Sequence, residues 1–184
     1  MAIRNTTERW GAVAKLLHWM IVALILVQVA LITYAEDLPL GMEKLATIAR
    51  HKSVGMTILA LAILRLTWRW LNPTPRLPPS MPVWQQRLAR LSHGVLYGTI
   101  FLLPLSGWMM SSAKNFSVSW FNLFQFPDLV APSEATFEIM HDTHESLVWV
   151  LAATALLHIA GALKHHFVDR DDVLKRMLPG ASAR

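Results

Sequence analysis

The chain contains no cysteine and few charged residues, and both shortages restrict what it can be. Without cysteine it can form no disulfide, no iron–sulfur cluster, no thiolate zinc site and no haem attached through a Cys-x-x-Cys-His sequence. Any bound metal must therefore use His, Met or carboxylate ligands. Charged residues make up 16% of the chain and hydrophobic residues 54%, whereas an ordinary soluble domain has about 25% and about 45–50%. This composition excludes a disordered chain and a highly charged soluble helix bundle.

The length and the charge balance set two further limits. A chain of 184 residues suits one domain, 1–184, rather than two. Its 17 Lys and Arg residues exceed its 12 Asp and Glu residues, which gives a formal charge of +5. In a soluble protein this excess would raise the question of nucleic acid. The apolar content points to membrane lipid as the partner instead, and we expect no nucleic-acid partner.

Four segments are apolar enough to cross a membrane as helices. The uncharged runs 16–35, 91–113 and 146–163 can each span a hydrocarbon core of about 30 Å. A shorter run, 53–64, continues through Arg65 and Arg69 and two Trp residues, which suit an interface. We therefore predict an all-α, four-helix transmembrane bundle with spans at about 12–35, 49–71, 91–113 and 144–167.

The connections between these spans also carry information. The prolines of 72–75 and 77–79 cannot continue a helix, so the second span must end before them. The segment 114–145 is polar and aromatic, and 133–138 could begin a short surface helix. Most of the Lys and Arg residues lie in or beside the two termini and the loop before the third span. The positive-inside rule therefore places both termini and this loop in the cytoplasm.

Histidines occur at two depths of the predicted bundle. Antiparallel spans put His51 and His144 at the outer level and His18 and His158 at the inner level. His144 and His158 are 14 residues apart, about 21 Å along a helix and on nearly the same face. Facing histidines can bind a haem iron from both sides, so we predict two stacked haems on the pairs His51/His144 and His18/His158. His141, one turn before His144, could replace it as the outer ligand.

Other residues fit this arrangement, although each has a simpler explanation. Arg65 follows His51 by 14 residues, which puts it at the inner level, where haem propionates are natural partners. It could instead extend toward the interface from a helix end. Gly55 and Gly161 would let a flat macrocycle approach closely, but contacts between helices explain them equally well.

Two histidines near the cytoplasmic surface could serve a quinone. His165 follows His158 by seven residues, about 10 Å nearer the cytoplasm. That place suits a group that binds a quinone carbonyl and gives it protons. For His165, and for His93 at the inner end of the third span, contact with lipid phosphate is the alternative. His166 has no assigned role.

Several short motifs, taken in their order along the chain, resemble one family. They are Leu17-His18-Trp19, Arg50-His51-Lys52-Ser53-Val54-Gly55, Asn72-Pro73-Thr74-Pro75, Leu103-Pro104-Leu105-Ser106-Gly107, His144-Glu145, Leu157-His158 and His165-His166-Phe167. Each motif is weak alone, but their order and spacing cover nearly the whole chain. On this basis the chain resembles the prokaryotic cytochrome b561 family of four-helix membrane cytochromes.

The resemblance implies a multi-pass protein of the bacterial inner membrane that carries two haem b groups on His18, His51, His144 and His158. Proteins of this kind pass electrons between an outer donor and membrane quinone. One branch, the superoxide oxidases, oxidises superoxide at the outer side and reduces ubiquinone near the inner haem. His165 matches the quinone-side histidine of the family, and His93 matches a recurring position without an assigned role.

Basic residues beside the outer haem ligand suit an anionic donor. Arg50 and Lys52 flank His51 on a side otherwise rich in acids, so they could steer superoxide toward the haem edge. They could equally pair with propionates or lipid headgroups. Lys114 could belong to the same patch.

Three functions fit the sequence. The first is a superoxide:ubiquinone oxidoreductase. The second is a cytochrome b subunit that passes electrons between a periplasmic or membrane partner dehydrogenase or hydrogenase and quinone, with the aromatic segment 115–121 as a possible docking surface. That segment could equally lie in the headgroup region or cover the outer haem. The third is a transporter or structural membrane protein whose histidines bind a metal ion or protons, and it predicts no haem.

Overall fold

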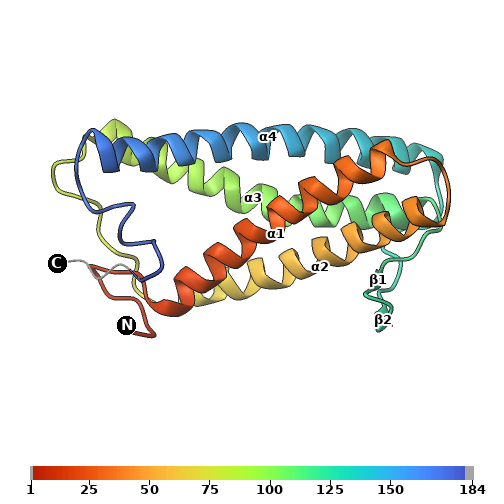
Figure 1. The fold of residues 1–184 in the computed structure, drawn as a ribbon, viewed down its shortest axis with the longest axis horizontal. Helices are drawn as coiled ribbons and strands as arrows, with labels where there is room; N and C mark the ends of the chain where they lie inside the picture. Colours follow the sequence, from red (N-terminus) through yellow and green to blue (C-terminus); the bar gives the residue numbers. More distant parts are fainter. Residues whose placement is uncertain (1, 181–184) are drawn as a thin grey trace.

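Four long helices and one small hairpin make up the fold in the computed structural model, which describes residues 2–180 (Figure 1). The helices are α1 (Ala12–Asp37), α2 (Met42–Trp70), α3 (Val83–Ala113) and α4 (Glu134–Phe167). Strands β1 (Ser119–Trp120) and β2 (Phe124–Gln125) pair antiparallel in the connection between α3 and α4. All four helices are long and apolar enough to cross a membrane. The predicted all-α, four-helix architecture is thus confirmed.

Three of the helices begin earlier than the predicted spans. The predicted starts were residues 49, 91 and 144, whereas α2, α3 and α4 begin at Met42, Val83 and Glu134. The short surface helix expected at 133–138 is instead the first part of α4. Ser133 caps it, because its Oγ accepts a hydrogen bond from the Thr136 N–H at 3.2 Å. As the loop prolines require, α2 ends at Trp70.

Each helix packs on the helices that precede and follow it in the sequence, and not on the others. α1 packs on α2, α2 on α3, and α3 on α4, whereas the fully described helix α4 makes no close backbone contact with α1 or α2. One core cluster, Ile21 with Val54 and Ile58, joins α1 to α2. None of the residues of α4 is buried by the described part of the chain. α4 is therefore held within the bundle through α3.

The first and last described segments lie at the same end of the bundle, as four crossings require (Figure 1). Following the charge rule, we refer to it as the cytoplasmic end. The segment 168–180, dark blue in Figure 1, runs across this end from α4 to α1. There Lys15 Nζ donates to the Leu178 carbonyl at 3.0 Å and Trp19 Nε1 donates to the Met177 carbonyl at 2.9 Å. The segment thus connects two helices that do not pack on each other.

The hairpin is attached to the outer half of α2. Ser53 Oγ donates to the Ser119 carbonyl at 2.9 Å, and Trp120 Nε1 donates to Thr57 Oγ1 at 3.0 Å. Val118, just before β1, is fully buried with Met56 and other residues of the second core cluster. These contacts fix the aromatic segment to the bundle, while Phe116 and Phe121 within it stay exposed.

Candidate functional site

Three histidine rings from three helices meet in the inner half of the bundle. They are His18 of α1, His93 of α3 and His158 of α4. The ring centres of His18 and His158 lie 6.4 Å apart, and those of His93 and His158 lie 5.1 Å apart. Since α1 and α4 do not pack on each other, His18 and His158 face each other across the space between two separated helices.

The spacing of these rings can be compared with the geometry of a shared metal ion. An imidazole nitrogen binds a metal ion at about 2.0 Å, so two imidazoles on opposite sides of one ion hold their ring centres roughly 6 Å apart. The distance between His18 and His158 is close to this value, and the distance between His93 and His158 is too short. His18 and His158 can therefore hold one iron between them.

Gly161 lies one turn beyond His158 and leaves open space beside it. A Cβ atom added to Gly161 would meet no described atom within 4 Å. No contact between the described helices therefore accounts for Gly161. Gly55 is different, because an added Cβ would lie 3.1 Å from Gln28 Nε2 of α1. Gly55 serves the contact between α1 and α2.

At the outer level, His144 is held by α3 through one ring nitrogen. Its Nδ1 lies 3.0 Å from Ser106 Oγ, whose own hydrogen is donated to the Leu103 carbonyl at 3.0 Å. Ser106 Oγ must then accept, so His144 carries its proton on Nδ1 and leaves the Nε2 lone pair free for a metal. Gly107 allows this approach, because an added Cβ would lie 3.2 Å from His144 Cε1.

The expected partner, His51, is half-buried on α2. Its buried Nδ1 has no hydrogen-bond partner within residues 2–180, and an unpaired polar atom of this kind costs free energy. His141 is exposed and its ring lies 5.7 Å from that of Phe137 on its own helix. The contact with Ser106 thus belongs to His144 and not to His141.

Arg65 turns toward the bundle rather than toward the helix end. Its Nη1 donates to the Ala14 carbonyl of α1 at 3.2 Å, and the side chain is half-buried. Ala14 lies about one helix turn before His18 on α1, and the Arg65 guanidinium carbon lies 6.0 Å from the centre of the Tyr97 ring of α3. Arg65 is therefore at the inner level, as predicted, and beside the inner pair of histidines.

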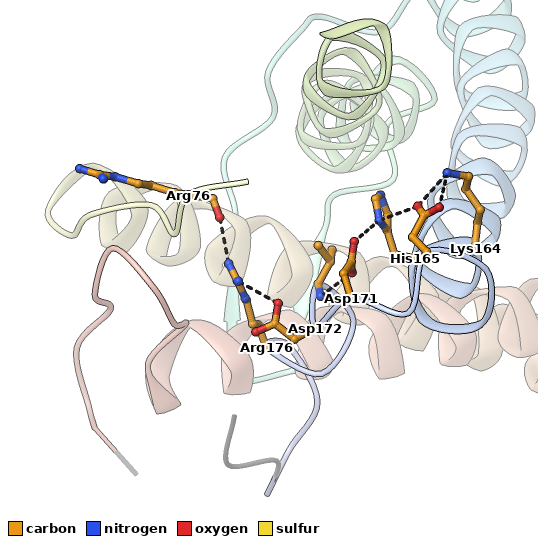
Figure 2. Close-up of polar contacts among 8 residues, drawn as sticks. Arg76, Lys164, His165, Asp171, Asp172 and Arg176 are labelled. Atoms are coloured by element: carbon orange, nitrogen blue, oxygen red, sulfur yellow. Dashed lines mark hydrogen bonds and ion pairs between the residues drawn. The ribbon is translucent and has the colours of Figure 1, made fainter. Parts of the chain in front are cut away.

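His165 is held by carboxylates of the segment that follows α4 (Figure 2). Its Nδ1 lies 2.7 Å from Asp171 Oδ2 and 3.2 Å from Asp169 Oδ2. Asp171 is itself fixed, because its Oδ1 accepts from the Val173 N–H at 3.0 Å. This arrangement orients the ring and leaves Nε2 for another partner.

The same three side chains could be considered as a metal site, because their ligand atoms lie within 4.8 Å of one another. However, Lys164 Nζ lies 2.9 and 2.7 Å from the two oxygens of Asp169 and already balances its charge. We interpret the cluster as a hydrogen-bonded ion-pair network. Neighbouring His166 is half-buried, and its ring centre lies 4.8 Å from that of Phe167.

The three basic residues expected near the outer haem have different surroundings. Arg50 is exposed. Lys52 is half-buried, and its Nζ donates to Ser111 Oγ at 2.6 Å, which ties α2 to the end of α3. Lys114 forms an ion pair with Glu134 at 2.7 Å, so its charge is balanced locally. Of these three residues, only Arg50 is exposed.

Some residues of these sites had no predicted role. Ser106 and Gly107 stand in one of the quoted motifs, but only their contact with His144 reveals what they do. Asp171 lies six residues after His165, beyond the end of the helix, where no periodic pattern connects the two. A contact across a turn or between two helices produces no periodic pattern in the sequence, so the spacing of residues does not predict it.

Comparison with known proteins agrees with this geometry. The model of the family described as prokaryotic cytochrome b561 matches residues 9–180. The chain is 32% identical over 185 aligned residues to cytochrome b561 homolog 2 of Escherichia coli K12, covering 100% of this chain and 98% of the relative. It is 29% identical to cytochrome b561 homolog 1 of the same organism, with 94% and 98% covered. It is also 27% identical to the probable superoxide oxidase CybB of Yersinia pestis, with 89% and 92% covered.

These matches extend over nearly the whole chain and contain all four helices. They agree with the four membrane-spanning helices and with a location in the bacterial inner membrane. Membership of the family also implies haem b. The chain belongs to the prokaryotic cytochrome b561 family and is a membrane electron-transfer protein.

Proposed function

We propose that the chain binds two haem b groups, oxidises superoxide at its periplasmic end and reduces ubiquinone near its cytoplasmic end. His51 and His144 hold the outer haem, and His18 and His158 hold the inner one. The observation that carries the proposal is the opposed pair His18 and His158, whose ring centres lie 6.4 Å apart between helices that do not pack on each other. Haem b held by these histidines would supply one-electron transfer.

The electron donor is proposed from the charge beside the outer pair. Arg50 is exposed next to His51, and Lys52 lies on its other side. A small anion is attracted to such a patch, which raises its local concentration and its rate of encounter. Superoxide fits because it is a small anion that gives up one electron. The similarity to the probable superoxide oxidase of Yersinia pestis supports the same donor.

The acceptor site is proposed at His165. Asp171 Oδ2 accepts from His165 Nδ1–H at 2.7 Å, so Nε2 donates a hydrogen bond to a quinone carbonyl oxygen when the ring is doubly protonated. His165 lies seven residues beyond His158, about 10 Å nearer the cytoplasm. A histidine in this place can pass a proton from the cytoplasmic side to the reduced quinone.

The overall reaction balances with two protons as the third reactant, beside superoxide and ubiquinone. Two superoxide anions each lose one electron and leave as two molecules of oxygen. One ubiquinone accepts the two electrons and takes up two protons, and it leaves as ubiquinol. Arg50 and Lys52 attract superoxide. The four histidines would hold the two haems at the outer and inner levels. His165 gives protons to the reduced quinone.

The test is an optical difference spectrum with haem quantitation on the purified, detergent-solubilised protein, followed by superoxide and then by a ubiquinone analogue. We expect two b haems per chain, which superoxide reduces and the analogue reoxidises. Absence of haem would overturn the proposal, and a single haem per chain would overturn its two-site form.

A second function is distinguished by the same experiment. Two haems that superoxide does not reduce would indicate a cytochrome b subunit that takes electrons from a partner dehydrogenase or hydrogenase. The feature that favours this function is the hairpin, which is fixed to α2 and exposes Phe121, Leu123 and Phe124. Exposed aromatic residues on a fixed support are typical of protein interfaces.

A further inference from the structure

A small cavity near the cytoplasmic end of the bundle is lined largely by hydrogen-bond donors. It lies between α1, α2, α3 and the segment before α1, and its lining includes Asn5, Arg65, Trp68, Arg69 and Tyr97. Arginine offers five N–H donors and no acceptor, and the tryptophan indole offers one donor. This composition suits a ligand that accepts hydrogen bonds.

Two donors among the lining residues are buried and have no partner within residues 2–180. Asn5 is only 5% exposed, and its Oδ1 accepts from the Gly11 N–H at 3.0 Å, which leaves Nδ2 unbonded. Trp68 Nε1 is also buried and unbonded. Buried donors are normally hydrogen-bonded, because an unpaired one loses its interaction with water without replacement. One ligand oxygen could satisfy each of them.

Two guanidinium groups bring positive charge to the same cavity. The Arg65 and Arg69 guanidinium carbons lie 6.0 and 5.8 Å from the centre of the Tyr97 ring. Neither forms an ion pair with an acidic residue in the described part of the chain, and Arg65 uses one N–H for the Ala14 carbonyl. Two like charges in a half-buried site repel each other unless an anion lies between them. A neutral acceptor would not remove this repulsion.

We propose that this cavity binds an oxyanion, either a carboxylate or a phosphate. Arg65 and Arg69 contact it through their guanidinium groups, and Asn5 Nδ2 and Trp68 Nε1 donate to it. The planar guanidinium group matches both kinds of oxyanion, because it offers two parallel donors.

Two sources of the oxyanion fit the position of the cavity. A propionate of the inner haem fits because Arg65 bonds the Ala14 carbonyl, about one helix turn before His18 on α1. The phosphate of a lipid headgroup fits because the cavity lies toward the cytoplasmic ends of the helices. The propionate source rests on the proposed inner haem, whereas the phosphate source does not.

Three substitutions test the cavity with little change in its shape. Trp68→Phe removes one N–H, and Arg69→Gln removes one charge. Asn5→Asp keeps an oxygen for the Gly11 N–H and replaces the free donor with an anionic oxygen. Arg87→Gln is the matched control, since Arg87 is exposed on α3 and does not line the cavity. Haem absorbance and size in detergent verify that each variant folds.

Each source has its own measurement. Lipid phosphate is tested by native mass spectrometry of the purified holoprotein titrated with phosphatidylglycerol. Propionate is tested by infrared difference spectra, oxidised against reduced, of protein that carries haem labelled with ¹³C at its propionate carboxyl groups. If phosphate is the source, each variant binds phosphatidylglycerol roughly tenfold more weakly. If propionate is the source, the labelled carboxylate band shifts in each variant while lipid binding stays the same.

Either result supports the oxyanion site and identifies its source. Unchanged lipid binding together with an unchanged band in all three variants would overturn it, as would equal changes in Arg87→Gln. A wild-type protein without the inner haem would contradict the proposed function, yet the lipid titration would still test the cavity. Trp68→Phe removes the indole N–H and leaves the hydrogen bond between Asn5 and Gly11 in place, so it keeps the test decisive where Asn5→Asp does not fold.

Discussion

Asp171 controls which nitrogen of His165 carries a proton and how the ring is turned. Its Oδ2 lies 2.7 Å from His165 Nδ1, and the Val173 N–H holds its other oxygen. In Asp171→Asn the charge is lost and the ring is held less firmly. Loss of such an orienting partner costs about 10–100-fold at comparable histidine sites. We expect reoxidation of the reduced haems by a ubiquinone analogue to slow by about tenfold or more, while their reduction by superoxide stays unchanged in stopped-flow measurements.

Asp172→Asn is the control for this prediction, because Asp172 lies in the same segment but pairs with Arg176 at 2.8 Å (Figure 2). An equal loss of quinone reactivity in both variants would mean that the segment as a whole matters, and not the contact between Asp171 and His165.

Ser106 has the corresponding role at the outer level. In Ser106→Ala, the His144 Nδ1–H loses its acceptor, which lies 3.0 Å away in the native protein. The ring then becomes free to turn, and we expect about 10–100-fold weaker binding of the outer haem. Haem quantitation after dilution in detergent measures this change. Exposed Ser146 on α4 supplies the control variant Ser146→Ala, and loss of the inner haem instead of the outer one would contradict the assigned pairing.

Steering of superoxide is tested most directly at Arg50. Arg50→Gln removes an exposed charge, whereas substitution of Lys52 would also break its bond to Ser111. The Debye length falls from about 30 Å at 0.01 M salt to about 3 Å at 1 M. We therefore expect superoxide to reduce the variant several-fold more slowly than the wild type at low salt and at nearly the same rate at high salt. Equal rates at low salt would exclude steering by Arg50.

At the scale of whole elements, the segment 168–180 is fastened to α1 by a few hydrogen bonds. Trp19→Phe removes the donor to the Met177 carbonyl and keeps most of the ring. One such bond contributes about 1 kcal/mol, which corresponds to roughly fivefold more frequent opening of the segment. We expect trypsin to cleave after Lys175 and Arg176 about fivefold faster. Trp84→Phe, at an exposed position of α3, should leave the cleavage rate at its wild-type value.

The helices could be predicted from the sequence where lipid imposes a requirement. A span must be long and uncharged, because the bilayer offers no water to its backbone or to its charges. This requirement ends at the membrane surface. The first turns of α2, α3 and α4 lie beyond the uncharged runs, so the runs did not predict where these helices begin. The end of α2 was predictable because the prolines that follow Asn72 cannot continue a helix.

The sequence predicted the depth of the candidate site residues in the membrane, but not the contacts between their side chains. The rise per residue was enough to place His18 and His158 at one level, and their rings do meet there. It could not reveal that His93 would join them at 5.1 Å from His158, because that contact depends on how α3 rotates against α4. Nor could it connect Arg69 with Trp10, just before α1, whose ring centre lies 6.0 Å from the Arg69 guanidinium carbon.

For the molecule as a whole, α4 makes no close backbone contact with α1 or α2 in the described chain. Helix α4 packs on α3 alone, and it has no residue buried by the described chain. A group bound by histidines from both sides would connect α4 to the other helices. A ligand that binds only the folded state stabilises it, by about 4 kcal/mol when its concentration is 1,000 times the Kd. Haem should therefore stabilise the position of α4 more than that of any other helix.

This expectation can be measured by hydrogen–deuterium exchange in detergent on holoprotein and on protein produced without haem. We expect the amides of α4 to exchange at least tenfold faster in the haem-free protein. Those of α2 should change much less, because α2 keeps its core clusters with α1 and the hairpin. The variant His141→Ala, which alters an exposed histidine of α4, should keep both haems and the slow exchange. Equal acceleration in α2 and α4 would mean that haem stabilises the bundle uniformly and does not hold α4 in place.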